Sequence, residues 1–147
     1  MLPDFELIPH TADLQIRVYG ATQAELFKHA LIGMFQAIGP EAANCTYLNN
    51  RLVCKELNHH HNVTIQAYDI EQLLVDFLSQ ALYLSDVHNE AYLDVTIKDI
   101  TPTRIKATLH GVTVTSFEVV EIKAVTYHNL AITQHNSVWQ TDIVFDI

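Results

Sequence analysis

The sequence predicts an α+β fold in a single domain, residues 1–147, with a mostly antiparallel or mixed β-sheet packed against two main α-helices. Its 147 residues are 49% hydrophobic and 17% charged, which suits one domain with a sizeable core. Two segments carry apolar residues at helical spacing, and about eight show the alternation of strands. These elements do not follow one another as βαβ units, so antiparallel pairing is favoured.

The N-terminal part of the chain predicts two strands followed by a helix. Phe5–Ile8 and Leu14–Tyr19 are the strands, because apolar and polar side chains alternate along the second. Residues 23–38 are the helix, with apolar side chains recurring at helical spacing. Thr22 and Glu25 form a capping box at its start, in which each side chain accepts a hydrogen bond from a backbone amide.

The middle of the chain predicts a loop, a hairpin and a second helix. Residues 41–50 have loop composition. Residues 51–57 and 63–68 have strand character, and the histidines His59–His61 fall in the hairpin loop between them. Asp69 is the N-cap of the second helix. The buried stripe of that helix consists of Leu73, Leu74, Phe77, Leu78, Ala81 and Leu82.

The C-terminal part of the chain predicts further strands. Alternating apolar residues mark 93–97 and 105–109, with a turn at Thr101-Pro102 between them. Residues 124–133 and 138–147 are also strand-like. We therefore expect the chain to end inside a sheet.

The charge balance argues against several classes of function. Lys and Arg number 8 against 17 Asp and Glu, which gives a formal net charge of −9. Because a negative surface repels a phosphate backbone, strong direct binding of nucleic acid is not expected, whereas a metal ion or a basic partner is. No apolar run reaches the ~18 residues of a membrane span, and the acidic N-terminus lacks the charge of a signal peptide. We expect a soluble, cytoplasmic protein without membrane contact.

The cysteines and the histidine run give weak signals. Cys45 and Cys54 lack CxxC spacing and have no further zinc ligands beside them, so we expect small core or loop residues in a reducing compartment. His59–His61 suggests metal binding by composition, but consecutive residues on a hairpin loop rarely converge on one ion. We expect these histidines to be structural. The chain has no P-loop, GxGxxG, GxSxG or HExxH motif.

Two acidic positions are candidates for a metal site. Asp13 lies between the first two strands, where side chains are displayed, with His10 as an accessory residue. Asp146 ends the last strand one residue before the α-carboxylate of Ile147, and a divalent cation would relieve the repulsion between these anions. The alternatives are a turn closed by Asp13 and a frayed terminus, although the apolar Ile147 continues the strand pattern.

Lys123 is the only lysine or arginine after Lys106. A lone cation in an acidic segment could neutralise carboxylates or donate to a phosphate, or it could be an ordinary surface lysine at a strand edge. Strand alternation places it on the same face as Val125, which would face the core. Because a buried lysine is costly, we expect either a bulge that turns it outward or a carboxylate partner, with Asp13 and Asp146 as candidates.

Four blocks of the sequence resemble the archease family, in that family's order and over essentially the whole chain. The four together are specific. The region from Cys45 to His61 matches no motif of the family. The blocks are Phe5-Glu6 with His10-Thr11-Ala12-Asp13-Leu14, Ala24-Glu25-Leu26-Phe27 with Ala30, Leu73-Leu74-Val75-Asp76-Phe77-Leu78 with Leu82-Tyr83-Leu84, and Ile122-Lys123-Ala124-Val125-Thr126-Tyr127-His128 with Val144-Phe145-Asp146-Ile147.

The resemblance implies an accessory protein rather than an enzyme. Archeases activate an RtcB-type tRNA-splicing ligase, which is GTP- and metal-dependent and joins RNA ends carrying a 2′,3′-cyclic phosphate or 3′-phosphate to a 5′-hydroxyl. They promote guanylylation of the ligase and so allow multiple turnover. By resemblance, Asp13, Asp146 and Ile147 hold a divalent ion, calcium or magnesium, and Lys123 takes part in activation. The partner is the ligase, with tRNA and GTP reached through it.

Three alternatives stay open beside this reading. One is a general tRNA-maturation chaperone, for example of a tRNA methyltransferase. Another is a stand-alone metal-dependent hydrolase that uses His10, Asp13 and Asp146, and the third is a metal-stabilised interaction module. With the resemblance, we expect Asp13 and Asp146 to meet on one side of the sheet, as an acidic tip that could enter a cationic, phosphate-handling pocket.

Overall fold

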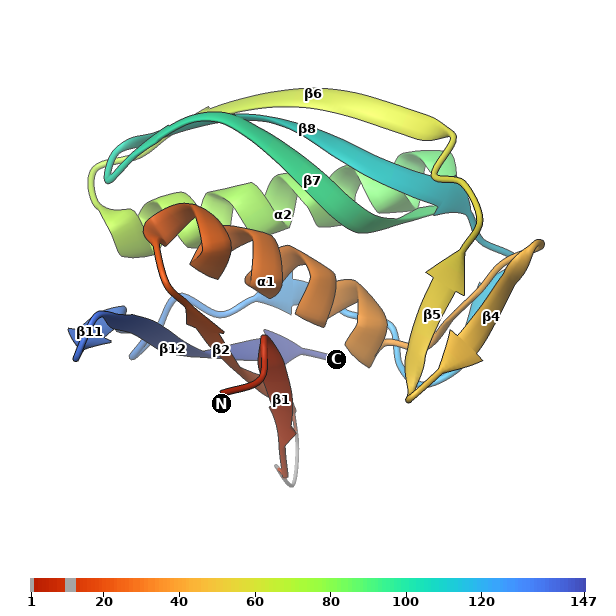
Figure 1. The fold of residues 1–147 in the computed structure, drawn as a ribbon, viewed down its shortest axis with the longest axis horizontal. Coiled ribbons are helices and arrows are strands. Elements are labelled where there is room, and N and C mark those ends of the chain that lie inside the picture. The colour runs from red at the N-terminus through yellow and green to blue at the C-terminus, as the bar shows by residue number, and fades with distance from the viewer. Residues whose placement is uncertain (1, 10–12) are drawn as a thin grey trace.

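Two helices lie between two main β-sheets. The computed structural model describes residues 2–9 and 13–147. Figure 1 shows α1 (Gln23–Ala37) and α2 (Ile70–His88) as the middle layer, with one sheet above them and one below. The predicted α+β class is confirmed, and both predicted helices are present.

The lower sheet in Figure 1 carries the N-terminal and C-terminal strands side by side. All of its pairings are antiparallel. In strand order it consists of β1 (Phe5–Ile8), β2 (Leu14–Gly20), β12 (Val138–Asp146) and β10 (Ala124–Val125), and β11 (Thr133–His135) pairs separately with β12.

The upper sheet has three antiparallel strands in the order β6, β8 and β7. Its inner face packs against the helices and buries the alternating apolar residues of β8, as the sequence predicts. The strands run over His59–Gln66 for β6, Glu90–Thr101 for β7 and Arg104–Thr113 for β8. Both outer strands therefore pair with β8, which is the central strand of the sheet.

Side chains cap both helices in the predicted way. Thr22 Oγ1 accepts a hydrogen bond from the backbone N of Glu25 at 3.1 Å, and Glu25 Oε1 accepts one from the backbone N of Ala21 at 3.3 Å. Asp69 Oδ1 accepts one from the backbone N of Gln72 at 2.8 Å. These contacts satisfy amides that have no partner inside the helix.

The core fills the space between the helices and the sheets. The rings of Phe27 and Phe77 join the two helices at a centroid distance of 5.9 Å, and Phe35 meets Tyr92 of β7 edge-on at 5.4 Å. The predicted buried stripe of α2 is confirmed except for Leu82, which is only partly buried. No helix in the described part of the chain is long and apolar enough to span a bilayer.

The segment 41–50 is not the loop that the sequence suggests. Most of it belongs to a hairpin whose two-residue turn is Asn49-Asn50, with φ angles of 52° and 65°. Asparagine tolerates this left-handed backbone, which matches the twist of a hairpin. The short strands of this region are β3 (Pro40–Glu41), which pairs with β9 (Ser116–Phe117), and β4 (Cys45–Leu48), which pairs with β5 (Arg51–Cys54).

Cys45 and Cys54 form a disulfide, whereas the sequence led us to expect small core or loop residues. They face each other across the hairpin of β4 and β5. Their spacing in the sequence carries no such information, because only the hairpin register makes them directly opposed.

The histidine run lies in strand β6 and not in a hairpin loop. Pairing with β8 begins at His59, which is opposite Gly111. Because side chains alternate along a strand, His59 and His61 share one face and His60 lies on the other. The loop prediction was wrong because a run of polar residues shows no apolar alternation to mark the start of the strand.

The predicted strand at 124–133 is interrupted. Within this segment, only β10 and, from residue 133, β11 pair with β12. Between them the backbone N of Leu130 donates to the carbonyl O of Tyr127 at 3.0 Å, and Asn129 has a φ of 61°. This turn separates a segment that composition alone presents as continuous.

Candidate functional site at the end of the lower sheet

Asp13 and Asp146 occupy neighbouring positions at one end of the lower sheet. The antiparallel ladder between β2 and β12 ends at the pair formed by Leu14 and Phe145. Asp13 and Asp146 are the next residues along the two strands beyond this pair. The fold thus brings to one sheet edge two acidic positions that are 133 residues apart in the chain, by the difference 146 − 13.

The last strand is held in place up to Asp146. The backbone N of Lys123 donates a hydrogen bond to the carbonyl O of Asp146 at 2.7 Å, and the backbone N of Thr126 donates to Val144 O at 2.9 Å. The hydroxyl of Thr126 donates to Asp146 Oδ1 at 3.3 Å. The alternative of a frayed C-terminus therefore does not hold for the chain up to Asp146.

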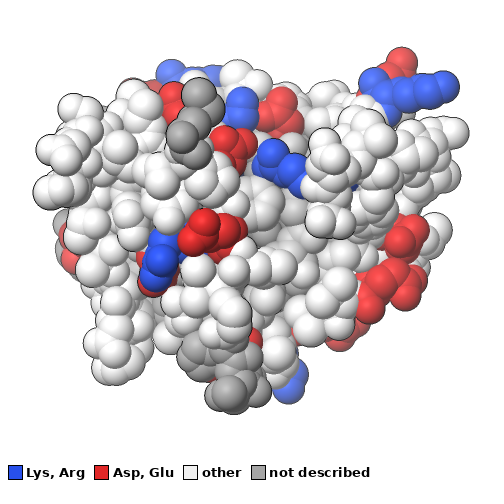
Figure 2. Space-filling model, turned by 60° about the horizontal axis from the view of Figure 1, so that its bottom comes forward, with Lys and Arg blue, Asp and Glu red and all other residues white. Residues whose placement is uncertain are grey.

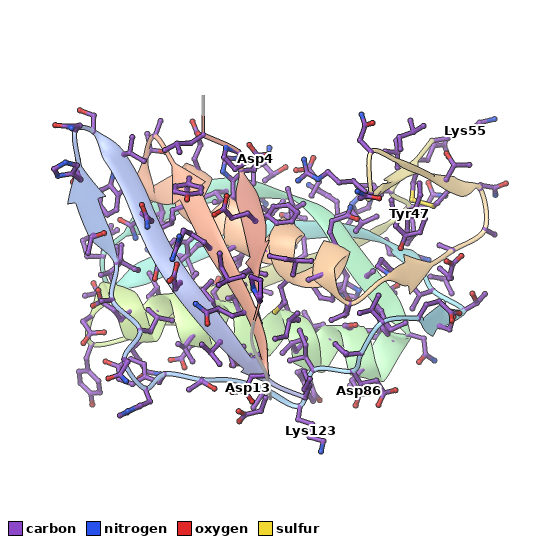
Figure 3. All side chains as sticks on the ribbon, turned by 90° about the horizontal axis from the view of Figure 1, so that it is seen from below. Asp4, Asp13, Tyr47, Lys55, Asp86 and Lys123 are labelled. Carbon is purple, nitrogen blue, oxygen red and sulfur yellow. A yellow bond between two sulfur atoms is a disulfide. The ribbon has the colours of Figure 1, made fainter. Side chains whose placement is uncertain are left out.

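Lys123 lies at the same end of the molecule as Asp13, and its exposed side chain extends away from the ribbon (Figure 3). It precedes β10, in which Ala124 is exposed and Val125 is buried. Because the strand begins one residue later, the alternation that would have turned Lys123 inward does not reach it. Its backbone amide contacts Asp146, while its ammonium faces solvent.

The oxygen donors at this end suit a hard divalent cation. Asp13 and Asp146 supply two carboxylates, and the α-carboxylate of Ile147 follows directly. Calcium and magnesium prefer such oxygens together with water. Among the described residues no group of three or more His, Cys, Asp or Glu side chains could hold a metal ion. The terminal carboxylate and water would therefore have to complete a site built on these aspartates. His10 lies outside the described residues.

A groove of about 640 Å³ opens beside this end. Its lining includes Asp86 of α2, the strand β9, and the segment of Glu121 and Ile122 that leads directly into Lys123. Acidic side chains gather along one side of the face shown in Figure 2. A partner that docks here would meet negative charge next to an exposed lysine.

A buried carboxylate with three hydrogen-bonding partners is not evident from the sequence. Glu90, at the start of β7, is only 4% exposed. The ring nitrogens His61 Nε2 and His59 Nδ1 lie 2.7 and 3.0 Å from its two oxygens, and the hydroxyl of Tyr92 donates to it at 2.8 Å. Burial raises the pKa of Glu90, but the hydrogen bonds from His61 and Tyr92 and the charges of both histidines outweigh it and lower that pKa. The sequence signal for this cluster is the spacing His59-x-His61, because it places both histidines on one face once the segment is known to be a strand.

Comparison with known proteins identifies the family. A sequence profile described as the Archease protein family matches residues 5–147. The chain is 32% identical over 151 residues to the protein archease of Methanosarcina mazei, and the match covers 97% of this chain and 95% of the relative.

Solved structures share the fold. The solution structure of protein 1598 from Methanobacterium thermoautotrophicum superposes with a TM-score of 0.66 at 24% identity, covering 98% of this chain and 99% of that one. The crystal structure of an archease from Thermotoga maritima, described as a possible chaperone, gives 0.63 at 21% identity, covering 95% and 94%. The profile match over nearly the whole chain and the identity to the Methanosarcina protein agree with this likeness, and the chain therefore belongs to the archease protein family.

Proposed function

We propose that this chain is an accessory protein that activates an RtcB-type, GTP-dependent RNA ligase of tRNA splicing. We further propose that it acts through Asp13, Lys123, Asp146 and Ile147, which we call the acidic tip. Membership of the family supports an accessory role, and the Thermotoga relative is described as a possible chaperone. The observation that carries the proposal is the register of β2 and β12, beyond whose last pair the two aspartates follow.

The acidic tip would bind Ca²⁺ or Mg²⁺ through Asp13, Asp146 and the α-carboxylate of Ile147. Few protein ligands and an exposed position imply weak binding, with water filling the remaining coordination positions. The ion would supply positive charge next to a phosphate of the ligase-bound substrate. Without it, the carboxylates of the tip would repel a phosphate group.

Lys123 is suited to contact a phosphate once the tip has docked. The hydrogen bond from its backbone N to the carbonyl O of Asp146 holds the backbone of Lys123 beside Asp146, and its exposed side chain extends into solvent from there. We expect the ammonium to contact a phosphate of GTP or RNA inside the ligase. A basic surface of the ligase would face the groove that Asp86 and Glu121 line, and would guide the encounter.

The proposal is tested by ligase guanylylation and by the number of ligation turnovers, with purified RtcB-type ligase and this chain. The variants Asp146→Asn and Lys123→Ala should keep the wild-type melting temperature and lose the stimulation. Matched controls are Asp99→Asn and Lys98→Ala, which change exposed residues of β7 away from the tip and should stimulate normally. Full stimulation by both tip variants would refute the proposal.

The alternatives differ in what the chain does without the ligase. A stand-alone hydrolase built on His10, Asp13 and Asp146 would turn over RNA or nucleotides in the presence of a divalent ion, and we expect no such turnover. A general tRNA-maturation chaperone would also stimulate a tRNA methyltransferase, which the same preparation can test. We propose a cytoplasmic location, with the ligase as the direct partner and tRNA and GTP contacted through it.

A further inference from the structure

Two histidines meet on the outer face of the upper sheet. His60 of β6 and His110 of β8 are directly opposed in the ladder. Their Nδ1 atoms are 2.7 Å apart, and the rings meet edge to face with their centroids 4.9 Å apart. In a hydrogen bond between two like nitrogens, one carries the proton and the other offers its lone pair. The pair therefore places two imidazole nitrogens side by side on the surface of the sheet.

The far nitrogen of His110 also has a fixed partner. His110 Nε2 lies 2.8 Å from the hydroxyl oxygen of Thr96 on β7. A metal-binding imidazole commonly ligates through one nitrogen and donates the N–H of the other to an oxygen, which fixes the tautomer and the ring. The hydroxyl oxygen of Thr96 occupies the position of that oxygen. Asp94 of β7 is opposed to His110 in the ladder, and its carboxylate forms an ion pair with Lys28 at 3.3 Å.

We propose that His60 and His110 form a binding site for a transition-metal ion such as Zn²⁺ or Cu²⁺, ligated by both Nδ1 atoms. Thr96 is the hydrogen-bonding partner behind His110, and water completes the coordination. Zn–N bonds of about 2.0–2.1 Å in a tetrahedron place two nitrogens about 3.4 Å apart. The two Nδ1 atoms, now 2.7 Å apart, must therefore move apart by about 0.7 Å, and the rings must turn so that both lone pairs point at the ion that replaces the shared proton.

The other histidines of the run are less suited to such an ion. His59 and His61 lie on the opposite face of β6, where both contact the buried carboxylate of Glu90. The His61 ring is also stacked against that of His88, at a centroid distance of 4.6 Å. Imidazole nitrogens favour transition metals, whereas the carboxylates of the acidic tip favour calcium and magnesium. The two sites should thus differ in ion preference.

An ion at this site would fasten the edge strand β6 to the central strand β8. Because binding to the folded state alone stabilises that state, saturating Zn²⁺ should raise the melting temperature. The affinity is measured by isothermal titration of ZnCl₂ into the full chain carrying no polyhistidine tag. Electron paramagnetic resonance of the Cu²⁺ form reports directly on nitrogen ligands.

We expect one Zn²⁺ per chain, lost in His60→Gln and in His110→Gln. Thr96→Val should weaken binding by about tenfold, because the partner behind a ligand is removed. The controls His61→Gln, His135→Gln and Asp146→Asn should retain wild-type affinity. The Cu²⁺ spectrum of the wild type should show nitrogen coupling that both pair variants lose.

Three results would overturn the proposal. The first is no Zn²⁺ binding by the wild type, and the second is wild-type affinity in both pair variants. The third is loss of binding in His61→Gln or Asp146→Asn with the pair intact, since the ion would then belong to Glu90 and its histidines or to the acidic tip.

Discussion

The carboxylate of Glu90 is nearly as buried as the apolar residues around it, and three side chains hold it there. His59 and His61 reach it from β6, and Tyr92 reaches it from its own strand. Such a cluster is stable only while each polar group keeps its partner, because an unpaired buried group loses its hydration without replacement.

Glu90→Gln should lower the free energy of unfolding at neutral pH by about 1.5 to 3 kcal/mol, because hydrogen bonds to a charged group are lost. The pKa of Glu90 is lowered in the folded state, so the stability it contributes is present above the pKa of an unfolded glutamate and is lost as the pH falls through the folded value. The difference between wild type and variant in chemical denaturation should therefore shrink under acid. Glu56→Gln, at an exposed site, should change little. A difference that stays constant from neutral to strongly acidic pH would contradict this account.

The acidic tip and the pair of His60 and His110 differ in how far the sequence predicts them. Asp13 and Asp146 attract notice because each borders a strand with clear alternation, and strand ends are recognisable locally. The partnership of His60 with His110 depends instead on the register between two strands, 50 residues apart in the chain. No local pattern carries that register, and the loop predicted for His59–His61 was therefore wrong.

At the scale of elements, helices and long strands follow from periodicity, whereas short strands do not. The capping side chains of Thr22 and Asp69 mark the helix starts in the sequence itself. The hairpin of β4 and β5 has four residues in each strand, too few for alternation to stand out. The Asn49-Asn50 turn and the two cysteines indicate a hairpin only when they are considered together, and only once the register of the two strands is known.

The disulfide should stabilise this hairpin more than the rest of the fold. Closing so short a loop is worth about 2 to 3 kcal/mol at most in the chain-entropy account. The hairpin also keeps other anchors, since Leu52 is buried and the side chain of Gln36 bonds both its backbone groups at 2.8 and 3.1 Å. We expect the double variant Cys45→Ser/Cys54→Ser to fold and to unfold at lower denaturant concentration than the wild type.

A reducing agent provides the matched control for this prediction. It should lower the denaturant concentration at the unfolding midpoint of the wild type to that of the double variant, and it should leave the midpoint of the variant unchanged. Equal midpoints of oxidised wild type and variant would show that the disulfide does not contribute to stability.

At the scale of the whole molecule, the two ends of the chain build one sheet. The guanidinium of Arg17 on β2 forms two hydrogen bonds to Asp142 on β12, at 2.8 and 3.1 Å, and this carboxylate raises the pKa of Arg17 above its usual value. Strands β2 and β12 pair over seven positions from Gly20 to Leu14. The acidic tip is therefore the product of long-range pairing, while the histidine pair belongs to the opposite sheet.

The position of Ile147 permits a test that separates its carboxylate from the fold. A short Gly-Ser extension after Ile147 moves the negative charge away from Asp146. It leaves unchanged both the ladder with β2, which ends at Phe145, and the pairing of Asp146 with Ala124 of β10. The extended chain should melt at the wild-type temperature, bind Ca²⁺ more weakly in calorimetry and stimulate the ligase poorly. A control chain carries the same extension followed by one apolar residue, so that it again ends in an apolar residue with a free carboxylate. It should not restore Ca²⁺ binding, because this carboxylate lies too far from Asp146. Wild-type Ca²⁺ affinity together with full stimulation by the extended chain would remove the terminal carboxylate from the acidic tip.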